Sequence, residues 1–148
     1  MSGNPATIEI VNHQDRHVVE ESSAADLVRE LLVAEDLAAR AVTVVFVDDA
    51  YLSDLHARFL NDPSPTDIIT FDVGDGEAVE GELYISVDRA AAHAAEFGVA
   101  LADELQRLVI HGILHLAGMD DGDDDAQAAM RDRENHYLAR YPGALRLE

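Results

Sequence analysis

The sequence predicts one α/β domain of the α+β kind, in which a small mixed four-stranded sheet packs against helices. Three observations support this fold class. The chain has 148 residues, of which 48% are hydrophobic, so it can bury a core without disulfides. Short β-branched runs alternate with longer stretches in which apolar residues recur every three or four positions. No repeat or linker interrupts this pattern, so a single domain is expected over residues 1–148.

The first three elements are expected to be a strand, a helix and a strand. Residues 7–11 alternate enough between polar and apolar side chains to form a strand. Residues 24–37 place leucines on one helical face, and Ser22 or Ser23 can cap this helix, because a serine oxygen accepts from the free N–H groups at a helix start. Residues 41–47 are β-branched and almost continuously apolar, which is typical of a strand covered on both faces.

A helix and two more strands follow. The helix is expected over residues 50–60 and should end at the turn-rich segment 61–65, which contains two prolines. Residues 67–73 and 81–87 have the composition of strands. They lie close together in the sequence around a Gly-Asp-Gly-Glu loop, so they predict an antiparallel hairpin.

Three helices are expected to complete the chain. Asp88 can cap a helix over residues 88–97, and Gly98 can end it, because glycine reaches left-handed backbone angles at low cost. A second apolar-periodic stretch covers residues 101–117. The last helix, over residues 123–141, begins with aspartates, which favour the positive end of the helix dipole. The expected order is therefore β-α-β-α-β-β-α-α-α.

The stretch from His111 to Asp121 predicts a metal site. His111 and His115 are four residues apart, so on a helix both imidazoles lie on one face. Gly118 can end this helix, after which Asp120 or Asp121 can turn back as a third ligand. Such ligands suit Zn²⁺ best, although Ni²⁺, Co²⁺ or Mn²⁺ could replace it, and three protein ligands leave the open position of a catalytic site. The alternative is that both histidines are edge residues of an amphipathic helix.

Gly112 lies between the two histidines, and its lack of a side chain affects both how the helix packs and which reaction the site can catalyse. Glycine inside a helix costs about 1 kcal/mol relative to alanine, so we expect another backbone to approach closely there. Peptidases with a His-Glu-x-x-His motif carry their general base at this position, and glycine cannot accept a proton. The sequence therefore disfavours such a peptidase. Phosphodiester cleavage depends less on this base, because the 2′-hydroxyl of RNA is an internal nucleophile.

The charge and composition of the chain indicate what it can bind and where in the cell it is expected. Thirty acidic residues face ten basic ones, all of them arginines, for a formal net charge of −20. Nucleic-acid binders usually carry the opposite sign, so charge alone argues against a polyanionic partner. We favour an adaptation to high salt, in which charge repulsion is screened. The lack of cysteine, of a signal pattern and of a long apolar run predicts a soluble cytoplasmic protein without membrane contact.

Two further charged positions are expected to be structural. Arg107 lies one helical turn before His111 and could reach a substrate phosphate, but a surface ion pair with Glu104 or Asp103 is favoured. The run Asp-Arg-Glu at residues 132–134 is expected to form a solvated helix face.

Three motifs occur in order along the chain. They are residues 65–71, similar to Pro-Thr-Asp-Val-Leu-Ser-Phe; residues 81–86, similar to Gly-Asp-Ile-x-Ile-Ser; and His-Gly-x-Leu-His-Leu-x-Gly-x-Asp, beginning at His111. Together they resemble the YbeY family of bacterial metal-dependent endoribonucleases. The resemblance implies an α/β fold with a zincin-like helix, one Zn²⁺ per chain and cleavage of single-stranded RNA. It also implies a role in ribosomal RNA maturation and ribosome quality control.

The chain departs from the family pattern at two positions. The third ligand of the family is usually a histidine, where this chain has Asp121, which can still ligate zinc. Asp121 matches that position better than its neighbour Asp120. An arginine of the family corresponds to Leu60, counted back from Pro65, so a guanidinium that would hold phosphate is missing at that position.

The leading interpretation is a zinc-dependent, single-strand-specific endoribonuclease in which His111, His115 and Asp121 are the metal ligands and the catalytic residues. The expected partners are single-stranded RNA, in particular ribosomal RNA, and the small ribosomal subunit, but not DNA. Two alternatives stay open. One is a ribosome-associated binding factor whose metal is chiefly structural, and the other is a metal-dependent hydrolase of another substrate.

Overall fold

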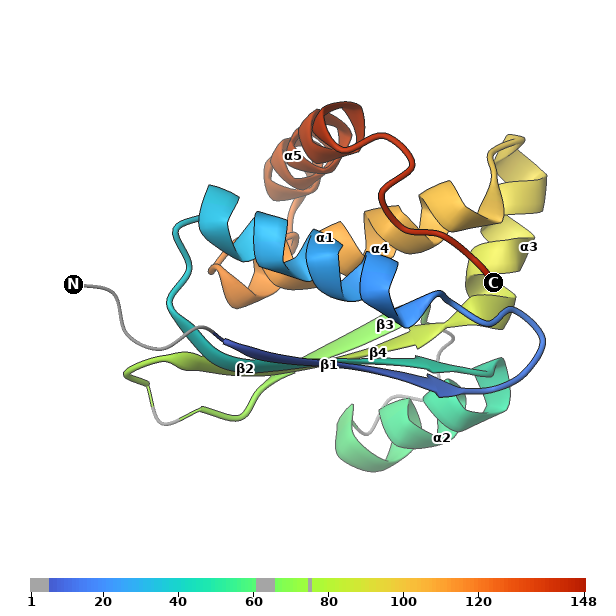
Figure 1. Cartoon of the computed structure of the whole chain (residues 1–148), viewed down its shortest axis with the longest axis horizontal. Helices are drawn as coiled ribbons and strands as arrows, with labels where there is room; N and C mark the ends of the chain where they lie inside the picture. The colour runs from blue at the N-terminus through green and yellow to red at the C-terminus, as the bar shows by residue number, and fades with distance from the viewer. Residues whose placement is uncertain (1–5, 61–65, 75) are drawn as a thin grey trace.

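A computed structural model describes residues 6–60, 66–74 and 76–148, apart from the side chain of Leu60. The described residues form the expected α+β fold, with one four-stranded mixed sheet and the elements in the predicted order (Figure 1). Helices α1, α4 and α5 lie on one side of the sheet, and α2 lies on the other. The elements are β1 (Thr7–His13), α1 (Glu21–Ala34), β2 (Ala39–Val47), α2 (Asp49–Leu60), β3 (Ile68–Asp72), β4 (Val79–Ser86), α3 (Val87–Phe97), α4 (Leu101–Leu116) and α5 (Asp124–Arg140).

The sheet has the strand order β1-β2-β4-β3. β2 pairs in parallel with β1 and with β4, whereas β3 and β4 are antiparallel. The hairpin predicted from the closeness of its two strands is therefore confirmed. β3 is one of the two edge strands, and α4 packs across β3 and β4. The face of α4 that carries the histidines is in this way brought to one edge of the sheet.

The predicted caps of α1 and α3 are wrong. α1 begins earlier than expected, at Glu21, so Ser22 and Ser23 lie inside its first turn. α3 is capped by Ser86, whose hydroxyl accepts from a backbone N–H of the first turn. Asp88 lies inside α3, and its carboxylate accepts from the first N–H of α2 instead. All three candidate caps were polar residues near a helix start, but among the described residues no side chain caps α1, and the residue before α3 caps that helix.

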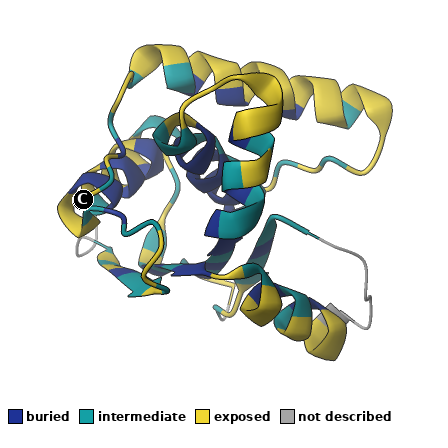
Figure 2. Cartoon of the chain, turned by 90° about the vertical axis from the view of Figure 1, so that its right-hand side faces the viewer, coloured by how far each residue is buried: buried dark blue, intermediate teal, exposed yellow. Residues whose placement is uncertain are grey.

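The main hydrophobic core lies between the sheet and the helices α1 and α4, whose inner faces are buried (Figure 2). A smaller apolar cluster lies under α2 on the other face of the sheet. α5 contributes little to this core, since its buried residues are Met130, Glu134 and Tyr137. Within the described residues, no helix is long and apolar enough to cross a bilayer.

Gly112 allows α4 to approach the β3–β4 hairpin. A Cβ atom placed on Gly112 would lie 2.7 Å from Cγ of Leu83 and 3.1 Å from Cδ1 of Ile68. We expected a backbone as the close neighbour, but these neighbours are side chains of β4 and β3. Leu83 is fully buried, so its side chain is enclosed by the core. Because Gly112 has no Cβ atom, α4 can lie close to β3 and β4 at the point where it carries the histidines.

We expect Gly112→Ala to lower the free energy of unfolding by about 1–3 kcal/mol, because overpacking against Leu83 outweighs the better helix propensity of alanine. Urea unfolding followed by circular dichroism measures this change. In a double-mutant cycle, Leu83→Ala should remove most of the penalty of Gly112→Ala. Purely additive effects of the two substitutions would contradict the packing explanation.

Candidate metal centre

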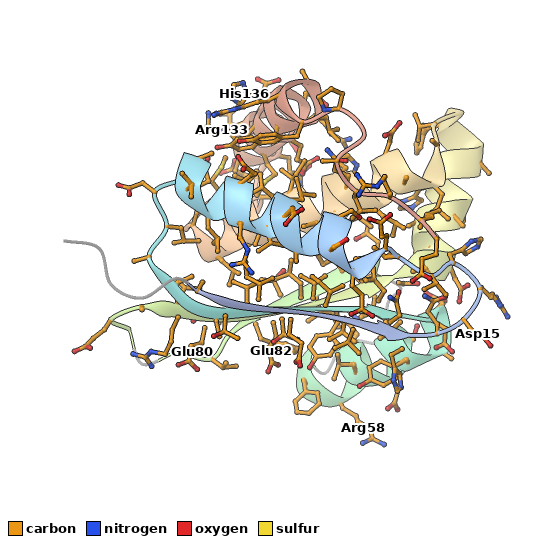
Figure 3. The ribbon with its side chains drawn as sticks, viewed as in Figure 1. Asp15, Arg58, Glu80, Glu82, Arg133 and His136 are labelled. Atoms are coloured by element: carbon orange, nitrogen blue, oxygen red, sulfur yellow. The ribbon has the colours of Figure 1, made fainter. Side chains whose placement is uncertain are left out.

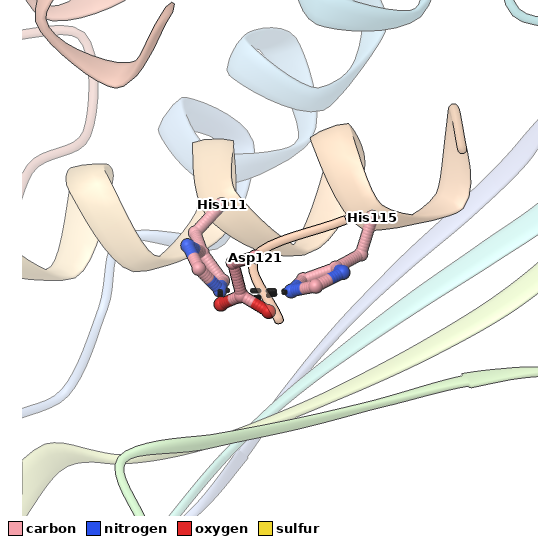
Figure 4. Close-up of side chains that lie close together, drawn as sticks. All are labelled: His111, His115 and Asp121. Carbon is pink, nitrogen blue, oxygen red and sulfur yellow. Dashed lines mark hydrogen bonds and ion pairs between the residues drawn. The ribbon is translucent and has the colours of Figure 1, made fainter. Parts of the chain in front are cut away.

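Three side chains converge beside the C-terminal half of α4 (Figure 4). His111 and His115 project from neighbouring turns of the helix, and their Nε2 atoms are 3.0 Å apart. Oδ2 of Asp121 lies 3.5 Å from Nε2 of His111 and 3.6 Å from Nε2 of His115. The structure therefore brings together the three residues that the sequence singled out.

The turn after α4 places Asp121 rather than Asp120 at this point. Gly118 has a φ of 99°, a left-handed conformation, and its N–H donates to the backbone oxygen of His115 at 3.0 Å. This reversal directs the chain back along α4. The carboxylate of Asp120 accepts from the N–H of Gly122 and so stabilises the turn itself. Asp121 is left free to face the histidines.

The three groups fit a divalent cation such as zinc by their chemistry and their spacing. Two imidazole nitrogens and one carboxylate oxygen form a donor set that catalytic zinc sites use. Two ligand atoms that are each about 2.1 Å from one tetrahedral ion lie about 3.4 Å apart. The separations of 3.0, 3.5 and 3.6 Å between the ligand atoms bracket this value.

Glu134 orients His111, and sequence reasoning missed it. Its Oε2 lies 2.6 Å from Nδ1 of His111, and its side chain is only 2% exposed. A carboxylate can only accept, so we infer that Nδ1 carries the proton and that Nε2 presents its lone pair to the site. The prediction of a solvated face at residues 132–134 is therefore wrong for Glu134. The signal was available, because Met130, Glu134 and Tyr137 are spaced as one helical stripe.

Arg107 joins Glu134 to a second buried carboxylate. Its Nη1 donates to Glu134 at 2.9 Å, and its Nε donates to Glu104 at 3.0 Å. Burial lowers the pKa of Arg107, but the two carboxylates more than offset this and raise it above its usual range. The predicted pairing with Glu104 is confirmed. The predicted surface location is wrong, because the Arg107 side chain is 15% exposed.

The same network keeps Glu134 ionised. Burial raises the pKa of this carboxyl, but hydrogen bonds from His111 and Arg107 outweigh burial and hold that pKa below its usual range. An ionised Glu134 makes His111 a better electron donor, as carboxylate partners do for metal-binding histidines.

A cleft of about 450 Å³ opens over the three converging groups. One wall is formed by residues between Thr66 and Asp72, that is, by β3 and the two residues before it. The other wall carries His111, His115 and Asp121. A smaller hollow of about 210 Å³ adjoins it between α4 and α5, and Arg131 contributes to its lining. The position of Leu60 is the last residue of α2, but its side chain lies outside the described part of the chain.

Comparisons with known proteins give the family. Residues 9–142 match the family model described as endoribonuclease YbeY. A Flavobacterium psychrophilum protein named endoribonuclease YbeY is 34% identical over 124 residues, which is 84% of this chain and 89% of the relative. A Chlorobaculum tepidum protein of the same name is 36% identical over 133 residues, covering 90% of this chain and 96% of the relative.

A solved structure agrees with these relatives in fold. The solution structure of TM1509 from Thermotoga maritima is similar with a TM-score of 0.63 at 28% identity, and the match covers 89% of this chain and 87% of that one. The sequence matches and the shared fold lead to one conclusion: the chain belongs to the endoribonuclease YbeY family.

Proposed function

We propose that this chain is a single-domain, zinc-dependent endoribonuclease that cuts single-stranded RNA in the cytoplasm and acts in ribosomal RNA maturation and ribosome quality control. Its proposed substrate is single-stranded RNA, in particular ribosomal RNA, and its proposed partner is the small ribosomal subunit. His111, His115 and Asp121 are proposed to hold one Zn²⁺ per chain. The observation that carries the proposal is the convergence of these three groups at the floor of an open cleft, in a member of an endoribonuclease family.

When bound, Zn²⁺ would act as a Lewis acid toward the phosphate at the cleavage position. The chain itself supplies the orientation of the ligands. Glu134 holds the proton of His111 on Nδ1, and Arg107 holds Glu134 in place and ionised. Gly112 brings the helix close to β3, so that the strand forms the opposite wall of the cleft.

Cleavage of unstructured RNA under single-turnover conditions tests this proposal. We expect cutting in the presence of Zn²⁺ and its loss after chelation, both in dilute buffer and in molar KCl. The high-salt arm matters because a chain of net charge −20 repels RNA phosphates unless the repulsion is screened. RNA that is bound but never cut would favour the ribosome-associated binding factor instead. Cleavage that persists without any divalent metal would contradict the metal-dependent mechanism.

Arg131 is the chain's own candidate for holding a substrate phosphate. It is exposed on α5 and lines the hollow next to His111 and Asp121. Among the described residues, no carboxylate forms an ion pair with it, although thirty acidic residues are present in the chain. A guanidinium that is free beside the cleft can pair with a phosphate in two parallel hydrogen bonds.

We expect Arg131→Ala to raise the KM for RNA about tenfold and to leave kcat nearly unchanged, because the lost contact serves binding in the ground state and the transition state alike. Steady-state kinetics on a short unstructured RNA measure both constants. Arg29→Ala is the matched control, since Arg29 is an exposed arginine on α1 and its loss changes net charge equally. Equal effects of the two substitutions would show that Arg131 acts only through net charge.

A further inference from the structure

A second group of metal-binding side chains lies where α3, α4 and the start of β3 meet. Asp67 precedes β3, His93 belongs to α3, and Glu104 belongs to α4; one ligand atom of each lies within 4.8 Å of the others. Nδ1 of His93 is 3.8 Å from Oδ2 of Asp67 and 3.8 Å from Oε2 of Glu104. We propose that Asp67, His93 and Glu104 bind a second divalent cation, separate from the one proposed at His111, His115 and Asp121.

The spacing favours an ion between these groups over direct bonds among them. At 3.8 Å, His93 is too far from either carboxylate for a hydrogen bond. Ligand atoms that share one cation lie between about 3 and 4 Å apart, because each is about 2.1 Å from the ion. The carboxylates of Asp67 and Glu104 have oxygens within 4.8 Å of one another, and a cation between them would lower their mutual repulsion. Direct ion pairs of His93 with the two carboxylates are the competing explanation, and they predict no bound metal.

Arg107 fixes Glu104 in a position to act as a ligand. Nε of Arg107 donates to Oε1 of Glu104 at 3.0 Å, and its Nη2 donates to Oε2 at 2.5 Å. Each carboxylate oxygen has two lone pairs, so Oε2 can accept from Arg107 and still face His93. The Glu104 side chain is 8% exposed, and a buried, held carboxylate loses little conformational entropy when it binds an ion.

The second site is too far from the first to share its chemistry. Glu104 and His111 are seven residues apart on α4, which corresponds to about 10 Å along the helix. Paired metals that act on one phosphate lie about 3.5–4 Å apart. The second cation would therefore contact a different part of the substrate. Asp67 lines the cleft, so an ion there would place positive charge at the edge of the cleft of a strongly acidic chain.

The donor atoms indicate which metals the second site prefers. It offers one imidazole nitrogen and two carboxylate oxygens, whereas the first centre offers two nitrogens and one oxygen. Oxygen-rich sites favour Mn²⁺ and Mg²⁺, and imidazole favours Zn²⁺. We therefore expect Mn²⁺ to enter the second site when Zn²⁺ already fills the first.

Titration with Mn²⁺ tests the proposal directly. The protein is loaded with one equivalent of Zn²⁺, and free Mn²⁺ is followed by electron paramagnetic resonance. Molar KCl is present so that the net charge of −20 does not collect ions unspecifically. We expect about one bound Mn²⁺ per chain in the wild type and a loss of affinity of more than about tenfold in His93→Ala. Absence of a bound Mn²⁺ in the wild type would overturn the proposal.

Two charge-matched variants separate ligation from electrostatics. Asp67→Asn removes one proposed ligand and one negative charge, whereas Glu96→Gln removes one charge from an exposed position on α3. We expect Asp67→Asn to lose the Mn²⁺ and Glu96→Gln to retain it. Equal weakening in both would show that the ion is attracted only by net charge. The Zn²⁺ content should stay at one equivalent in all variants, so this test is independent of the first centre.

Discussion

Replacing His115 by alanine is expected to abolish the tight binding of one Zn²⁺ per chain and, with it, RNA cleavage. Nε2 of His115 lies 3.0 Å from Nε2 of His111 and 3.6 Å from Asp121, so it supplies one of three proposed ligands. The two remaining ligands would bind zinc too weakly to retain it during dialysis. His115 is 29% exposed, and its removal should leave the fold intact.

Metal analysis after dialysis against a weak chelator measures this effect, together with cleavage of an unstructured RNA. His136→Ala is the matched control, because His136 is an exposed histidine on α5 (Figure 3) and its ring lies beside that of Tyr137. The control should retain both zinc and activity. One equivalent of bound zinc in His115→Ala would contradict the assignment of His115 as a metal ligand.

Glu134→Gln is expected to weaken zinc binding by about 10–100-fold and to lower the free energy of unfolding of the metal-free protein by about 1–3 kcal/mol. The glutamine amide has nearly the same shape but offers only one accepting oxygen. Glu134 accepts from His111 with one oxygen and from Arg107 with the other, so one of these donors would face an N–H group. The same substitution therefore affects the metal site and the fold.

Zinc titration with a competing chelator and urea unfolding measure the two effects of Glu134→Gln, and Asp132→Asn on the exposed face of α5 is the control. The pKa of Glu134 is lowered in the fold, so the ionised carboxylate stabilises the protein above the ordinary carboxyl pKa. That contribution is lost as the pH falls through the lowered value. The variant should therefore depend less on pH in the acid range; an unchanged acid profile and unchanged zinc affinity would contradict the role of Glu134.

Local patterns were sufficient to predict the order and type of every element. The β-branched run in β2 and the glycine after α3, which adopts a φ of 67°, mark their elements without reference to the rest of the chain. The caps of α1 and α3 were not predictable in this way. Asp88 could cap its own helix by sequence alone, but in the fold it accepts from the first N–H of α2, which is 39 residues away.

The first candidate centre was predictable because its residues are close in the sequence and share one helix and its turn. Glu134 was missed because its role depends on how α5 crosses α4, which periodicity within α5 does not reveal. Its burial could have been predicted from the stripe it shares with Met130 and Tyr137. His93 and Asp67 come from two other elements, so no local motif could bring them to Glu104.

Arg107 lies between two buried carboxylates, those of Glu104 and Glu134, and forms an ion pair with each. Losing the guanidinium alone would take the arginine partner away from both buried carboxylates, at a cost of several kcal/mol. Losing either carboxylate alone would remove one of the two ion pairs of Arg107. These three positions are therefore coupled in evolution: they can be exchanged together, whereas a stepwise path passes through a less stable intermediate.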